Sequence, residues 1–238
     1  KYLANIDPIR IVPRILELVS SSLDSLTEPH RTTSAIGMLC LCMTSVLNFA
    51  KTPAGIAPTV MLLPTIAQGI DSNDQIKSIF TFALLSNLAT STRIEDVSDC
   101  RVSGQDDWND DCQLAKEATS QFPDIALLFT ENLISYLRAY DSGSESAHAG
   151  LDPTIGKLIL AVSETFYGQL SDSILQLCTE KWIDYFWSDC SLSAAEIIGE
   201  VLSLSGRANP KLLDVLIAKI VGRIEEQISK GAGAMGSL

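Results

Sequence analysis

Apolar residues recur at helical spacing along most of the chain, and no stretch alternates with the two-residue period of a strand. Residues 15–23, for example, place their apolar side chains along one side of the expected helix. Helix start signals punctuate the pattern, since Asp7-Pro8 and Asp152-Pro153 each place a capping carboxylate before a proline at the first helical position. The sequence therefore predicts an all-α fold built from consecutive helices.

Helix pairs follow one another at intervals of about 40 residues, which is typical of an α-solenoid of HEAT or armadillo type. A single pair cannot bury its apolar face alone, so stacked neighbours must do it, with uncharged helices such as 32–50 forming an inner layer. An irregular helical bundle with the same periodicity remains the alternative. The nine expected helices are approximately 8–23 (restarting at Pro13), 27–49, 55–68, 75–88, 112–139 (bent at Pro123), 154–168, 171–187, 191–205 and 210–229. Gly69 is expected to end the third helix in a left-handed conformation, and Gly206 to end the eighth.

The chain divides into four segments. Residues 1–91 and 112–230 hold the expected HEAT-like helix pairs. Residues 92–111 break the pattern, and between Glu95 and Glu117 eight acidic side chains face only two basic ones. We interpret 92–111 as an exposed acidic loop that attracts basic tails or keeps a large scaffold in solution. Residues 231–238 are interpreted as a cloning tail outside the fold.

Charge and hydropathy narrow the class of partner. The 238 residues carry 29 Asp and Glu against 17 Lys and Arg, a formal net charge of −12. Direct nucleic-acid binding is therefore not expected, because phosphate contacts need clustered Lys and Arg. Residues 32–50 and 52–70 are uncharged and approach membrane-spanning length. Prolines in the second stretch and hydroxyl side chains in the first instead favour helices buried within protein, so no membrane partner is expected.

The six cysteines are spread through the chain rather than concentrated as in small secreted disulfide scaffolds. They are interpreted as reduced thiols of a cytosolic or nuclear protein. Cys40 and Cys42 point in different directions on one helix and can neither pair nor share a metal. The chain opens at Lys1 without a methionine or signal peptide, which suggests a piece of a longer protein.

No catalytic, cofactor-binding or metal-binding residue is assigned, and the chain is not expected to be an enzyme. Only His30 and His148 could serve a nucleophile pair, and no phosphate-binding glycine loop is present. Cys100 and Cys112 flank the acidic segment but match no zinc spacing, and the aspartates match no calcium loop. A reactive Cys112 would need positive neighbours, whereas its neighbours are negative.

Aromatic residues mark two further places. Trp108 stands among aspartates, where it is either a partner contact or an anchor for the loop. A second group falls at helical spacing and is interpreted as core or as a contact between repeats, with a ligand pocket as the minor alternative. It consists of Trp182, Tyr185, Phe186 and Trp187.

Two motifs carry a family resemblance. The first is the segment 23–33, with its Thr-Glu-Pro-His helix start; the second runs from Leu63-Pro64 through 69–74 (Gly-Ile-Asp-Ser-Asn-Asp) to Lys77. In this order and about forty residues apart, they resemble the large single-chain HEAT-repeat proteasome activator, the subunit 4 family. Each motif also has a local structural reading as a helix cap or a tight turn. The resemblance therefore identifies a scaffold, and no residue role is transferred from the family.

The resemblance implies a scaffold segment of an activator that caps the proteasome core particle and promotes ubiquitin-independent degradation of peptides and unstructured proteins. It also implies nuclear and cytoplasmic localisation and links to acetylated histones and DNA repair. The chain ends in Gly-Ser-Leu rather than the family's docking tail, so an internal segment is expected. The alternative is another HEAT adaptor, such as a nuclear-transport receptor or a phosphatase scaffold. Exposed solenoid ends predict self-association of the isolated segment.

Overall fold

The structure is a computed structural model that describes residues 6–23, 29–50, 53–91, 110–142, 153–168, 170–188 and 190–235. Eleven helices lie within these ranges, and no strand does. The first six are α2 (Pro8–Leu23), α3 (Pro29–Leu41), α4 (Met43–Ala50), α5 (Pro53–Ala67), α6 (Gln75–Ser91) and α7 (Asp110–Thr119). The remaining five are α8 (Phe122–Ser142), α9 (Pro153–Tyr167), α10 (Asp172–Phe186), α11 (Leu192–Ala208) and α12 (Pro210–Met235).

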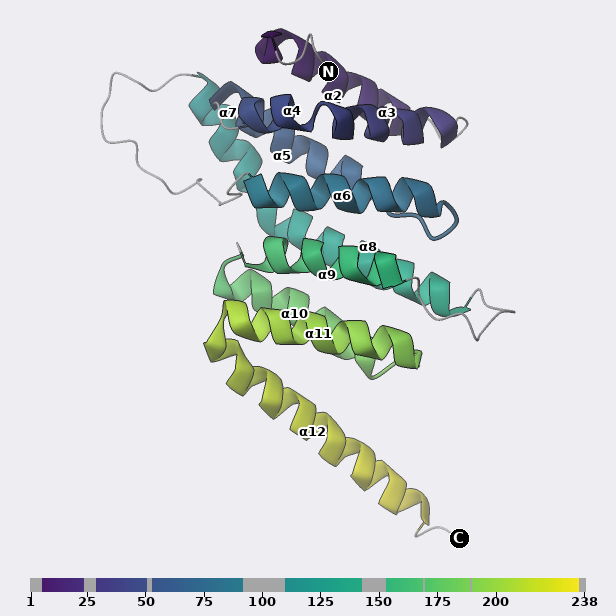
Figure 1. Cartoon of the computed structure of the whole chain (residues 1–238). Coiled ribbons are helices and arrows are strands. Elements are labelled where there is room, and N and C mark those ends of the chain that lie inside the picture. Colours follow the sequence, from purple (N-terminus) through teal and green to yellow (C-terminus); the bar gives the residue numbers. More distant parts are fainter. Residues whose placement is uncertain are drawn as a thin grey trace.

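The helices stack in two layers (Figure 1). In one layer α2 packs on α5, α5 on α7 and α8, α8 on α10, and α10 on the start of α12. In the other, α3 packs on α6, α6 on α9, and α9 on α11. The chain crosses between layers at each pair, so four helix pairs form an open-ended stack that α12 continues. This order confirms the predicted all-α solenoid and excludes the irregular bundle.

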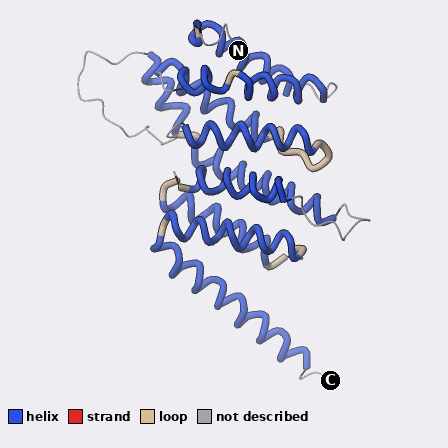
Figure 2. Tube along the Cα trace, viewed as in Figure 1, coloured by secondary structure: helices blue, strands red, loops and turns tan. Residues whose placement is uncertain are grey.

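The two sides of the stack differ in their connections. Turns within a pair, such as those after α5 and α10, lie at one edge, and connections between pairs, such as those after α9 and α11, lie at the opposite edge (Figure 2). Helices that precede the acidic segment pack directly on helices that follow it, α5 against α7 and α6 against α9. The first and second halves of the chain thus share one stack.

A continuous apolar core runs between the layers. Each large apolar side chain that is fully buried in this core contributes roughly 1.5–3 kcal/mol to stability. Side chains with no exposed surface come from both layers and from most pairs, including Val12, Ile36, Ile66, Phe82, Leu133, Ile159, Trp182 and Ile198. Stability is therefore distributed along the stack, as expected when each pair is covered by its neighbours.

Two expected helices are each split in two. The helix expected at 27–49 breaks at Cys42, whose N–H is shared by the carbonyls of Met38 and Leu39 while its own carbonyl accepts from Ser45 N. The resulting tight turn separates α3 from α4. The helix expected at 112–139 breaks before Pro123 rather than at it, and Pro123 lies in the first turn of α8, where its missing N–H costs little.

Other expected boundaries are also corrected. α2 runs through Pro13 without a restart, with Pro13 on its half-exposed side. α12 continues to Met235, so 231–235, set apart as a tail, is helical. The uncharged stretch 32–50 buries only part of its surface, because Met38 and Leu41 remain exposed.

The structure corrects the left-handed conformation expected at Gly69 and the helix end expected at Gly206. Gly69 does not adopt a left-handed backbone; a Cβ there would lie 2.4 Å from Thr81 Oγ1 and 3.2 Å from Ile36 Cδ1. Gly206 lies within α11, which ends at Ala208, and a Cβ there would lie 2.9 Å from Leu213 Cδ2. Each glycine permits close approach of a neighbouring helix rather than a special turn.

Candidate functional site

The residues considered for chemistry are not brought together by the described structure. Cys100, Trp108 and His148 lie outside the described residues, as does the side chain of Cys112. Across the described ranges, no group of three or more His, Cys, Asp or Glu side chains could hold a metal ion. Burial raises the pKa of the Cys178 and Cys40 thiols, which keeps both in the less nucleophilic neutral form.

The aromatic group at the end of α10 is largely core, as predicted. Trp182 and Tyr185 are buried, whereas Phe186 is partly exposed and packs edge-on against Trp187, with ring centroids 5.6 Å apart. Trp182 Nε1 donates to Tyr167 Oη at 2.8 Å. These residues therefore join α10 to α9 within the core.

A buried hydrogen-bond chain extends this contact to a third helix. Tyr167 Oη lies 2.8 Å from Thr130 Oγ1, which in turn lies 2.9 Å from the Ala126 carbonyl and donates to it. Because Thr130 has a single hydroxyl proton, Tyr167 must donate to Thr130. Burial, reinforced by the nearby Cys178, raises the pKa of Tyr167 well above its usual range. The chain therefore stays neutral and connects α8, α9 and α10.

The α5–α6 turn is held by its own side chains. Asp71 Oδ1 accepts from Asn73 N at 2.9 Å, and Asp74 Oδ1 caps α6 by accepting from Lys77 N at 2.9 Å. Ser78 Oγ donates to the Asp71 carbonyl at 2.7 Å and accepts from Asp71 N at 2.9 Å. The second motif is thus a self-contained turn and cap, as its local reading predicted.

Charge contributes to the same turn. Lys77 Nζ lies 3.3 Å from Asp71 Oδ2. Partial burial alone would raise the pKa of Asp71, but the hydrogen bond from Asn73 and the ion pair with Lys77 outweigh it and hold the pKa below its usual value. The carboxylate is therefore the form that the fold stabilises.

The two motifs meet in space. Thr33, in the first turns of α3, donates through Oγ1 to Asp74 Oδ2 at 3.4 Å. Because α3 packs on α6, the helix start of the first motif lies against the cap of the second. Together they form a contact between neighbouring repeats.

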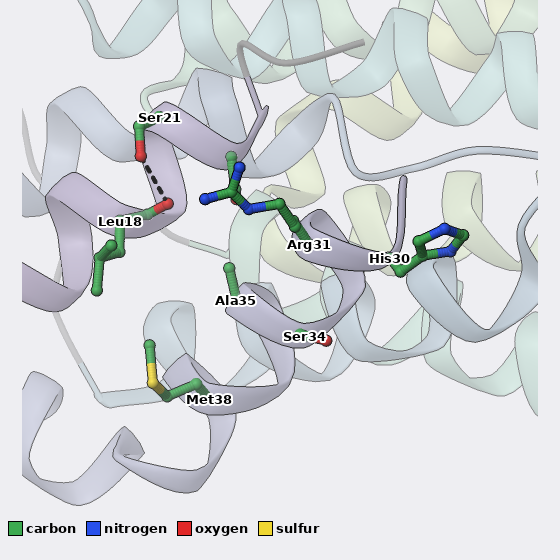
Figure 3. Close-up of a pocket in the computed structure, with 8 residues that line it drawn as sticks. Leu18, Ser21, His30, Arg31, Ser34, Ala35 and Met38 are labelled. Atoms are coloured by element: carbon green, nitrogen blue, oxygen red, sulfur yellow. Dashed lines mark hydrogen bonds between the residues drawn. The ribbon is translucent and has the colours of Figure 1, made fainter. Parts of the chain in front are cut away.

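An open groove lies between α2 and α3 at the N-terminal end of the stack, with a volume of about 510 Å³. The side chains of Leu18 and Met38 approach each other from the two helices, and the Arg31 guanidinium extends toward the Ser21 turn of α2, whereas His30 points away (Figure 3). Ser21 Oγ donates to the Leu18 carbonyl rather than into the groove. The groove lacks any buried charged group and is an end face rather than a ligand pocket. Its lining is completed by Ser22, Ser34 and Ala35.

The C-terminal end also exposes apolar surface. Leu212 and Leu216 of α12 are buried, but a second face of the helix is open, with Ile217 56% and Ile228 66% exposed. The residues of this face recur three or four positions apart and form one stripe. We name this set the α12 stripe: Leu213, Ile217, Ile220, Val221, Ile224 and Ile228.

These features define a class of protein. A two-layer stack of helix pairs with apolar end faces, and with no catalytic or metal-binding cluster in its described ranges, is a HEAT-type α-solenoid segment. No helix in the described ranges has the length and apolar character needed to cross a bilayer.

Comparison with known proteins identifies the family. The family model for "Proteasome activator complex subunit 4, mid HEAT repeats region" matches residues 1–237. The chain therefore belongs to the proteasome activator complex subunit 4 family, and the match extends far beyond the two motifs.

Individual relatives agree with this assignment. Proteasome activator complex subunit 4B of Danio rerio is 30% identical over 57% of the chain and 7% of the relative's length. Subunit 4 of Xenopus laevis is 26% identical over 77% of the chain and 10% of its own length. Subunit 4A of Danio rerio is 25% identical over 88% of the chain and 12% of its own length. The chain thus spans only about a tenth of the length of these relatives.

Proposed function

We propose that this chain is a non-enzymatic scaffold segment of a proteasome activator that caps the core particle. In this proposal the whole activator promotes ubiquitin-independent degradation of peptides and unstructured proteins. The family match over residues 1–237 carries the proposal. The described repeats support it, because their contacts, such as Thr33 with Asp74, join helices to one another rather than surround a ligand.

The segment's own part in this function is architectural. Each repeat of a solenoid contacts only its neighbours, so a middle segment sets the spacing and direction of the repeats on either side. The α2–α3 groove and the α12 stripe are suited to such repeats, and in isolation they would instead favour self-association. Location in nucleus and cytoplasm, binding of acetylated histones, and a part in DNA repair are further parts of the proposal. The acidic segment 92–111 is a suitable attractant for basic tails, although acetylation itself weakens such attraction by removing lysine charge.

The test uses the full-length activator and purified proteasome core particle. We expect the activator to retain core particles and stimulate hydrolysis of a fluorogenic peptide, and the isolated segment to do neither. An activator that neither binds core particle nor stimulates hydrolysis would overturn the proposal. The nuclear-transport and phosphatase adaptor alternatives would be tested next. They come second because no observation on the described residues favours them.

The acidic segment can be tested in the same assay. Full-length activator with four of the six aspartates of the segment changed to asparagine keeps the chain length and removes only charge. The control deletes 143–150, a stretch of mostly small and polar residues with one acidic residue. Loss of core-particle or histone-tail binding only in the asparagine variant would make the segment a contact, and equal behaviour would make it a solvated loop. The four aspartates are Asp106, Asp107, Asp110 and Asp111.

A further inference from the structure

α12 is attached to the stack only through its first half. Leu212 and Leu216 are buried, and Leu213 lies close against Gly206 at the end of α11. From Val221 to Ser229 every residue is exposed. Figure 1 shows α12 diverging from α10 and α11 toward its C-terminal end. The helix is therefore fixed at one end and open along the other.

Beyond Leu216, α12 meets α10 through charged side chains. Lys219 Nζ pairs with Glu180 Oε1, and Arg223 Nη2 donates to Asp184 Oδ1 at 3.1 Å. The two ion pairs are one helical turn apart, because their members are four positions apart on α12 and four positions apart on α10. We call these two successive ion pairs the ladder. The ladder lines an open cleft of about 240 Å³, to which Ile183 and Gly222 also contribute.

The preceding boundary in the same layer is built differently. Between α8 and α10 an exposed ion pair also occurs, Lys181 Nζ with Glu131 Oε1 at 2.6 Å. That boundary, however, is also held by the buried chain of Thr130, Tyr167 and Trp182. Exposed ion pairs are weak and screened by salt, whereas buried hydrogen bonds are not. The two boundaries should therefore respond differently to ionic strength.

We propose that α12 is a hinged helix that pivots at the α11–α12 corner and is held against α10 by the Lys219–Glu180 and Arg223–Asp184 ladder. Competing charges or salt release the ladder and widen the angle between α12 and the stack. A small rotation at one repeat boundary changes the direction of all the repeats beyond it. The ladder is thus a point where charge adjusts the curvature of the solenoid. The inference concerns the chain itself and does not depend on the proposed function.

The test measures the distance between α10 and α12 directly. Spin labels are attached through an unnatural amino acid at the exposed positions 188, just beyond the end of α10, and 229, which avoids the native cysteines. Both positions lie far from the α11–α12 corner, so a rotation about that corner changes the distance between them. Labelled chain is diluted into unlabelled chain so that only distances within one molecule contribute, and pulsed EPR gives the distance distribution. Salt is raised from about 0.05 M to about 1 M, where the screening length falls to roughly 3 Å.

We expect the distribution to lengthen and become about twofold broader at high salt, and in Lys219→Gln/Arg223→Gln at low salt. The charge-swapped variant Glu180→Lys/Asp184→Lys/Lys219→Glu/Arg223→Glu should restore the narrow distribution. Glu131→Gln, which breaks the ion pair at the α8–α10 boundary from the α8 side, is the matched control and should leave the distribution unchanged. An unchanged distribution in the double glutamine variant, or equal broadening in Glu131→Gln, overturns the proposal.

Discussion

Thr33 and Asp74, 41 positions apart in the sequence, are joined by a hydrogen bond of 3.4 Å between Oγ1 and Oδ2. Each residue belongs to one of the two motifs that resemble the activator family. Asp74 also caps α6 through Lys77 N, so one carboxylate serves both its own helix and the neighbouring repeat. The pairing of these motifs in sequence therefore reflects a contact between repeats.

Gly69→Ala should destabilise the chain. The new methyl would lie 2.4 Å from Thr81 Oγ1, and overpacking of this kind costs about 1–3 kcal/mol. Gly199→Ala is the matched control, because its Cβ meets nothing within 4 Å and alanine favours helix by about 0.5–1 kcal/mol. Urea unfolding followed by circular dichroism should give opposite signs for the two variants, and equal shifts would contradict the close approach.

Ser78→Ala should lower the free energy of unfolding by about 1–3 kcal/mol, because the N–H of half-buried Asp71 loses its acceptor and the Asp71 carbonyl keeps only Asp74 N. Ser203→Ala, at an exposed position of α11, should change it by less than about 0.5 kcal/mol. The same urea measurement compares them. If the two serines cost the same, the Ser78 hydroxyl does not hold the turn.

The stability contributed by Asp71 should depend on pH. Its folded pKa is lowered below the unfolded value near 3.8, so the contribution is fully present above that value and is lost as the pH falls through the folded pKa. Asp71→Asn should therefore be less stable than the wild type at neutral pH, with a difference that shrinks in acid. Unfolding free energies measured across this pH range check the sign, and a constant difference would refute it.

Tyr167→Phe should destabilise the fold by about 1–3 kcal/mol, because the buried Trp182 N–H loses its acceptor. Combining it with Trp182→Phe removes both members of the contact. The double variant should then cost less than the sum of the single changes, because the two residues interact directly. Strict additivity in this cycle would show that the hydrogen bond contributes nothing.

The isolated segment should self-associate through the α12 stripe. Ile217→Gln with Ile224→Gln replaces two exposed apolar side chains at its centre and should lower the average mass seen by light scattering at high concentration. Ala218→Gln changes an exposed residue on another face and should have no effect. A wild-type mass that is monomeric at every concentration would exclude self-association.

The sequence predicted the class of fold because helical periodicity and caps are local properties. The Asp7-Pro8 start and the Asp74 cap both fall where expected, since a carboxylate and the N–H groups it caps lie within one turn. Helix ends were predicted less well. The breaks at Cys42 and before Pro123, and the passage through Pro13, were not predicted, because neither the residue types nor the apolar periodicity at these positions marks where a helix ends.

The sequence by itself determined a chain of amphipathic helices and its family, because both depend on residue type and order. Only the tertiary structure showed that Gly69 and Gly206 serve close packing, since the atoms that exclude a Cβ come from residues distant in sequence or from the next helix. It likewise decided that Tyr167 joins three helices and that α12 rests on α10 through charge. Such relationships arise when helices meet across a turn, where no periodicity fixes which side chains face each other.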